Sequence, residues 1–98
     1  MEIMSVQVLI KTNALQIAPI LMDTFRVANF TVGALVANNF SITAPVPVFE
    51  LLFGVANVKA ARSGRESTLP LNALPLTAQN AIDAIVVPRQ PDFGPRSF

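Results

Sequence analysis

The chain has 98 residues, of which 52% are hydrophobic and only 13% are charged, and its net charge is +1. A chain of this length forms one small domain at most, and its charged share is about half of the usual one. The near-neutral charge argues against a nucleic-acid-binding protein, which normally carries a concentrated basic face. A single small core cannot bury so much apolar surface, so we expect part of that surface to face a partner.

The composition also lacks most of the side chains that catalysis uses. Cys, His, Trp and Tyr are all absent, which removes disulfides, thiolate metal sites and the commonest general bases. The six acidic residues are scattered, and no two share the spacing of a paired-carboxylate or calcium-binding motif. The four glycines do not form a phosphate-binding loop. We therefore expect no catalytic site, no cofactor and no metal.

The amino-terminal segment predicts one strand followed by less regular structure. Apolar side chains recur at every second position from Ser5 to Lys11, which is the period of a strand. The apolar residues of 15–21 surround Pro19, so this part is expected to form an edge strand or a short irregular segment. Residues 25–27 should then enter a long strand, with a bulge near Ala28-Asn29 that corrects the phase.

A hairpin over 30–44 is the predicted centre of the fold. Alternation over 30–37 and again over 40–44 indicates two antiparallel strands, and Asn38-Asn39 suits the turn between them. Five side chains of the hairpin should share one buried face: Phe30, Val32, Val36, Phe40 and Ile42.

One apolar helix is predicted near 48–62. Pro47 suits the first helical turn, and Gly64 stands where a left-handed C-terminal cap belongs. The segment is apolar nearly all round, so it needs burial on more than one face. Gly54 and three valines lower its helix propensity, which leaves a strand over 48–58 as the alternative.

No part of the chain predicts a membrane-spanning helix. Such a helix needs about 20 predominantly apolar residues. Five residues interrupt every window of that length in the central stretch: Asn38, Asn39, Pro45, Pro47 and Glu50. The start of the chain, Met1 to Met4, lacks the basic region of a signal peptide, so we expect synthesis in a host cytoplasm.

A tandem repeat of leucine and proline follows the helix. Residues 69–73 are Leu-Pro-Leu-Asn-Ala, and residues 74–78 are Leu-Pro-Leu-Thr-Ala. The recurring proline excludes a helix and favours extended backbone. Two interpretations stay open: a strap over the domain's own core, or an arm in a neighbour's groove with Leu71 and Leu74 as partner-binding residues.

The last part of the chain predicts one short element and then a tail. Thr77 is a suitable N-cap for a helix over 78–86, with an extended Val86-Val87 as the alternative. Residues 88–98 contain three prolines and show no periodicity. We expect this tail to bind a neighbouring chain through four residues: Arg89, Phe93, Arg96 and Phe98.

Together these elements predict an α+β protein in which the β part dominates. It should contain small antiparallel strands with the 30–44 hairpin, one apolar helix near 48–62 and an extended C-terminal arm. The predicted organisation is a compact β-rich domain with the helix over 1–62 and a loop with the Leu/Pro extended segment over 63–79. A short helix or strand and the arm should occupy 80–98.

The unburied apolar surface and the arms favour a non-enzymatic structural subunit of a large repetitive assembly. A virus or phage particle, with its minor capsid and cement proteins, is the most economical setting, by analogy alone. The expected partners are other subunits of the assembly, including copies of the chain itself, and neither nucleic acid nor a membrane; the expected location is the virion. The alternatives are a small membrane-associated subunit of a multiprotein complex and, more weakly, an apolar small-ligand binding module.

Overall fold

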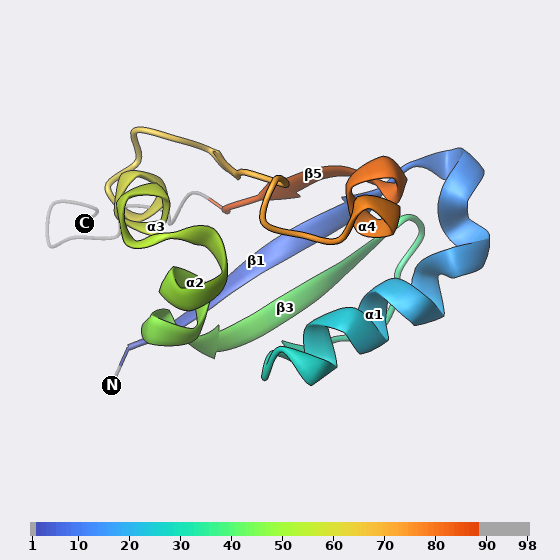
Figure 1. Ribbon diagram of the computed structural model, residues 1–98, viewed down its shortest axis with the longest axis horizontal. Helices are drawn as coiled ribbons and strands as arrows, with labels where there is room; N and C mark the ends of the chain where they lie inside the picture. The colour runs from blue at the N-terminus through green and yellow to red at the C-terminus, as the bar shows by residue number, and fades with distance from the viewer. Residues whose placement is uncertain (1, 89–98) are drawn as a thin grey trace, which may run out of the picture.

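Five strands form one antiparallel sheet in the order β2-β3-β1-β5-β4 (Figure 1). The computed structural model describes residues 2–88, of which 44% are helical and 29% are in strands. The predicted α+β class is confirmed, although helix exceeds strand. The elements are β1 (Ile3–Ile10), the 3-10 helix η1 (Thr12–Ile17), α1 (Ala18–Val27), β2 (Thr31–Val32), β3 (Asn39–Pro45), α2 (Val46–Phe53), α3 (Val55–Arg62), β4 (Thr68–Leu69), α4 (Leu76–Ala81) and β5 (Ile82–Val86).

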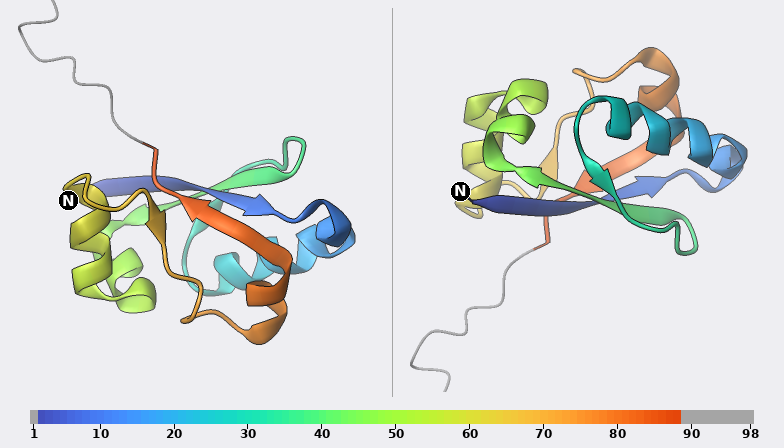
Figure 2. Two further views of the ribbon diagram at one scale, coloured as in Figure 1. Left: turned by 90° about the horizontal axis from the view of Figure 1, so that it is seen from above. Right: turned by 90° about the horizontal axis from the view of Figure 1, so that it is seen from below.

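The strand order interleaves two β-α-β units. β1 lies between β3 and β5 and is antiparallel to both. β2 is antiparallel to β3, so β1 and β2 are parallel with β3 between them. β3 and β5 are likewise parallel with β1 between them. This is the split βαβ arrangement of ferredoxin-like folds, here with an added edge strand β4 and helix α4. All helices lie on one face of the sheet (Figure 2).

The first predicted strand is confirmed as β1. Its even-numbered side chains are buried, while its odd-numbered side chains are exposed or half-buried. This alternation is the one expected when a sheet has helices on one face only. β1 is therefore the central strand of the sheet, because it pairs with β3 on one side and with β5 on the other.

The prediction of an edge strand or irregular segment before residue 25 is wrong, and so is the strand entry at 25–27. Residues 12–27 form η1 and α1 instead. Ala18, Leu21 and Phe25 are buried, and their spacing of three and four places them on one stripe of a helix. Pro19 lies in the first turn of α1, where its missing amide hydrogen costs no helical bond.

The hairpin is confirmed, but its first arm is shorter than predicted. Only Thr31 and Val32 form a continuous ladder with β3, and Val36 adds an isolated bridge to Asn39. The tight turn is formed by Ala37-Asn38, one residue earlier than predicted, and Ala37 has a positive φ of 53°. The backbone N–H of Val36 donates to the carbonyl of Asn39 over 2.8 Å, and the reverse bond measures 3.0 Å.

The predicted buried face of the hairpin is right except at one position. Phe30, Phe40 and Ile42 are buried, and Val32 packs half-buried against the same core. Val36 is 65% exposed. The prediction fails there because the first arm leaves the ladder after β2, so the alternation of 30–37 does not continue to Val36.

The apolar helix near 48–62 is present, but Gly54 divides it into α2 and α3. Gly54 adopts φ 95° and ψ 141°, a combination that residues with a side chain rarely adopt. The predicted cap is observed at Gly64, whose φ is 84°. The N–H of Arg65 donates to the carbonyl of Ala60 over 3.0 Å and closes the end of α3.

The second half of the predicted 78–86 helix is a strand. α4 begins at Leu76 and ends at Ala81, with Pro75 rather than Thr77 as its N-cap residue. β5 follows without a loop and pairs with the second edge of β1. Residues 82–87 contain four β-branched side chains, which favour a strand over a helix.

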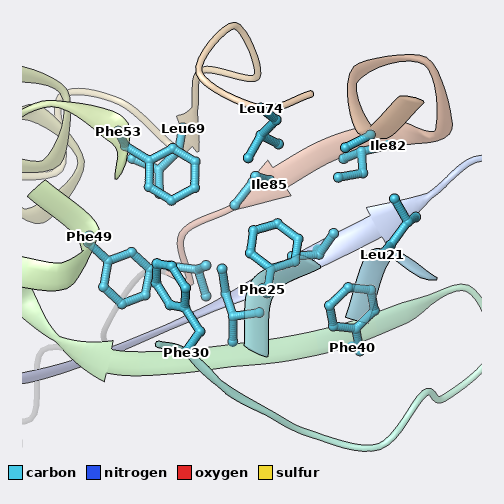
Figure 3. Close-up of a cluster of buried hydrophobic side chains, with 14 of the residues drawn as sticks. Leu21, Phe25, Phe30, Phe40, Phe49, Phe53, Leu69, Leu74, Ile82 and Ile85 are labelled. Atoms are coloured by element: carbon cyan, nitrogen blue, oxygen red, sulfur yellow. The ribbon is translucent and has the colours of Figure 1, made fainter. Parts of the chain in front are cut away.

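The core is built around an aromatic cluster between the sheet and the helices (Figure 3). The ring centroid of Phe25 lies 5.9 Å from that of Phe30 and 6.0 Å from that of Phe40. Phe30 also contacts Phe49 of α2, and their ring centroids lie 4.8 Å apart. Edge-to-face pairs of this kind add to the stabilisation from buried area. The cluster therefore ties α1, the hairpin and α2 to one face of the sheet.

Candidate interaction surface

The face of the sheet opposite the helices is covered by no element of residues 2–88 (Figure 2). Strand alternation and pairing define its residues, and we call this surface the open face. It comprises Ile3, Ser5, Gln7 and Leu9 of β1, Thr31 of β2, Asn39, Ser41, Thr43 and Pro45 of β3, Thr68 of β4, and Ala84 and Val86 of β5.

These residues form continuous rows across the strands. Gln7 lies opposite Ser41 on one side and opposite Val86 on the other. Leu9 similarly lies between Asn39 and Ala84. Directly opposed side chains on one face have their Cβ atoms about 4.5–5.5 Å apart. The open face is therefore one contiguous patch rather than a set of separate residues.

The open face carries no charged side chain. Its polar members are Ser, Thr, Asn and Gln, and its apolar members are Ile, Leu, Val, Ala and Pro. The charged residues nearest to it along the chain are Glu2, directly before Ile3, and, at the other end of β1, Lys11 and Asp83, the latter at the register shift between β1 and β5. Lys11 and Asp83 have opposite signs, so neither sign dominates that end of the face. A neutral partner could cover this face without burying an unpaired charge.

The open face also lacks aromatic side chains. Four-stranded RNA-binding sheets hold bases by stacking them on aromatic residues of the uncovered face. In residues 2–88 every Phe is buried on the helix side of the sheet: Phe25, Phe30, Phe40, Phe49 and Phe53. The open face therefore offers a nucleic acid neither a stacking side chain nor a cation.

Exposed apolar side chains also occur on the helix side, in smaller groups. Leu51, 90% exposed, and Val55 lie four residues apart on either side of Gly54. Ile20 and Val27 are exposed on α1, where they line a shallow hollow together with Asp23 and Thr24. These groups supply further contact surface, but none spans several elements as the open face does.

A larger hollow of about 740 Å³ lies around the end of the sheet where β1 begins. Its polar lining includes Glu66 and the ion pair between Glu2 and Arg62. Val87 and Pro88, the last described residues, form another part of its wall. With so many polar groups, this hollow is not the apolar pocket that a small apolar ligand requires.

The structure describes two of the six predicted partner-binding residues. Leu74 is 5% exposed and belongs to the protein's own core, and Leu71 packs half-buried against that core. The folded chain thus does not offer Leu74 to a partner, because the Leu/Pro segment packs on its own domain. The other four residues, Arg89, Phe93, Arg96 and Phe98, lie outside the described residues.

Sequence reasoning missed the open face as a site. The alternation of β1 already separates Ser5, Gln7 and Leu9 from the buried positions. The missing information was the pairing, because only the strand order places the neutral residues of β3 and β5 beside them. In the Leu/Pro repeat, sequence reasoning selected Leu71 and Leu74 as partner-binding residues. The leucine that is in fact most exposed is Leu76, at 72%.

The comparisons with protein-family models, curated proteins and solved structures give no match to this chain. Within residues 2–88, no helix has the length and apolar character needed to cross a membrane. The same residues contain no cluster of three or more potential metal-binding acidic side chains.

Proposed function

We propose that this chain is a non-enzymatic structural subunit of a large repetitive protein assembly, with a virus or phage particle as the setting. The observation that carries the proposal is the open face, a contiguous and charge-free surface on a protein with little charge elsewhere. The partners are other subunits of the same assembly, including further copies of this chain.

The chemistry of the open face suits the centre of a protein interface. The buried cores of such interfaces are depleted of charged residues. Burying an ion without a partner costs several kcal/mol, whereas a neutral hydroxyl or amide needs only a hydrogen-bond partner. Ser5 and Thr43 already satisfy each other through a hydrogen bond of 2.9 Å. Covering this pair with a neighbouring subunit costs less than covering charged groups would.

The exposed apolar groups on the helix side support contacts with more than one neighbour. Leu51 and Val55 face away from the core that Phe49 and Phe53 fill from the same helical region. The helices that carry them, α2 and α3, lie on the side of the sheet opposite the open face (Figure 2). A subunit with contact surfaces on two opposite sides can join neighbours in series, as repetitive assemblies require.

Sedimentation velocity of the full chain in detergent-free buffer, over a wide range of concentrations, tests this proposal. We expect the weight-average sedimentation coefficient to rise with concentration, because neighbours cover the open face. A single monomeric species at every concentration contradicts the proposal. Discrete species that form only with detergent contradict it as well, and favour the membrane-associated subunit instead.

A further inference from the structure

The described chain ends beside the open face. β5 is antiparallel to β1 and runs from opposite Ile10 to opposite Gln7. The N–H of Val87 then donates to the carbonyl of Ser67 over 2.8 Å. Val87 and Pro88 line the same hollow as Ile3 and Ser5, which belong to the open face. Residues 89–98 therefore start at one end of this face.

The dimensions of the open face favour an extended segment over a folded partner. The eight residues of β1 span about 26 Å, and five strands span about 24 Å. The flat outline of the face therefore measures at most about 620 Å², and each partner in a standard interface contributes roughly 800 Å² of accessible surface. Ten residues in extended form reach about 33–36 Å, enough to follow the whole length of β1.

The composition of residues 89–98 fits a neutral receiving surface. Pro91 and Pro95 restrict the unbound segment, which lowers the entropy lost when it is ordered. Phe93 and Phe98 can lie on the apolar members of the open face, Leu9 and Val86 among them. Aromatic side chains are enriched at the centres of interfaces, where they supply most of the contact energy.

The direction of β5 favours a neighbouring copy as the source of the segment. At Val86 the chain lies opposite Gln7 and runs along β1 towards Ile3, the first residue of that strand, four residues further on. A segment that continues in this direction past Ile3 leaves its own open face and meets a molecule placed beyond that end of β1. A tail of one copy on the face of the next is a head-to-tail contact, which repeats along a ring or filament.

We infer that the open face of each copy binds residues 89–98 of a neighbouring copy. This inference rests on the proposed function and adds to it both the receiving surface and the bound segment. It requires that an intermolecular contact place the end of one chain against β1 and β3 of another.

Crosslinking between single-cysteine variants of the full chain tests the inference, because the natural sequence contains no Cys. Chains with Ser97→Cys are mixed with an equal amount of isotope-labelled chains with Ser5→Cys, and a short bis-maleimide joins thiols that lie close together. A heterodimer identified by mass is necessarily intermolecular. The matched control replaces Ser5→Cys by Thr77→Cys, an exposed position in α4 on the helix side. Circular dichroism verifies that every variant folds.

We expect about tenfold more heterodimer with Ser5→Cys than with Thr77→Cys, because binding raises the local concentration of the two thiols. Adding Phe93→Ala and Phe98→Ala to the Ser97→Cys chain should bring the yield down to that of the control. Equal yields at the two positions in a self-associating sample overturn the inference but leave the proposed function standing. A crosslinked monomer from the Ser5→Cys/Ser97→Cys double variant overturns it in favour of the chain's own tail. A sample that does not self-associate overturns both.

Discussion

The side chains of Ser5 and Thr43 form a hydrogen bond of 2.9 Å across β1 and β3, in the open face. These residues are direct partners in the ladder that joins the two longest strands. Cross-strand hydroxyl pairs of this kind contribute about 0.2–1 kcal/mol. The pair thus satisfies two hydroxyl groups of the open face, and no charged group lies on that face.

Phe25 connects two parts of the core, so its removal should destabilise the fold strongly. We expect Phe25→Ala, Phe30→Ala and Phe40→Ala each to lower the free energy of unfolding by about 3–5 kcal/mol. Val36→Ala is the control, because Val36 lies on the same arm but is largely exposed; it should change stability by about 0.5 kcal/mol or less. Chemical denaturation measures the free energy of unfolding of each variant and of the control. If Phe30→Ala and Phe40→Ala prove as mild as Val36→Ala, the described hairpin packing is wrong.

Gly54 determines the break between α2 and α3, because its φ of 95° and ψ of 141° suit only glycine. We expect Gly54→Ala to lower the free energy of unfolding by about 1–3 kcal/mol through backbone strain. At Gly64 a Cβ would meet nothing within 4 Å, and Asn tolerates the left-handed region. Gly64→Asn should therefore cost clearly less in the same thermal or chemical melt. Equal costs at the two positions would show that the break is not held by Gly54.

Gly33 is required by the close approach of its backbone to Ser41, an open-face residue. A Cβ at position 33 would lie 2.4 Å from Ser41 Oγ, so Gly33→Ala forces this hydroxyl out of its rotamer at a cost of about 0.5–1.5 kcal/mol. Ser41→Ala removes the hydroxyl and should restore most of the loss. A double-mutant cycle on the free energy of unfolding measures this coupling. Additive effects of the two changes would contradict the described contact.

The sequence patterns predicted those elements that are determined by residues close together in the sequence. β1, the hairpin, the helices near 48–62 and the cap at Gly64 follow from alternation, turn residues and cap residues. The prediction over 12–27 fails for a specific reason, because a proline within a short apolar run also fits an edge strand. Ala18, Leu21 and Phe25 already have helical spacing, and a proline in the first turn agrees with it.

The open face was less predictable, because it depends on contacts between distant segments. Gln7 comes to lie between Ser41 and Val86 only through the strand order. Similarly, the strand at 82–86 depends on the free edge of β1, since Ala81 and Ile82 alone fit a helix as well as a strand. The secondary structure of such segments depends on which strand they pair with, and this pairing cannot be deduced from a single sequence.

The central claim is that a neighbouring subunit covers the open face, and sedimentation velocity of Gln7→Lys beside the unmodified chain tests it most directly. Gln7 lies in the middle of the charge-free rows, and lysine matches its length while adding a charge that no open-face residue can neutralise. Asn80→Lys, at an exposed site in α4, adds the same charge on the helix side as a control. We predict concentration-dependent association for the unmodified chain and for Asn80→Lys, and a shift towards monomer for Gln7→Lys. Unchanged association of Gln7→Lys, with its circular dichroism intact, would contradict the account.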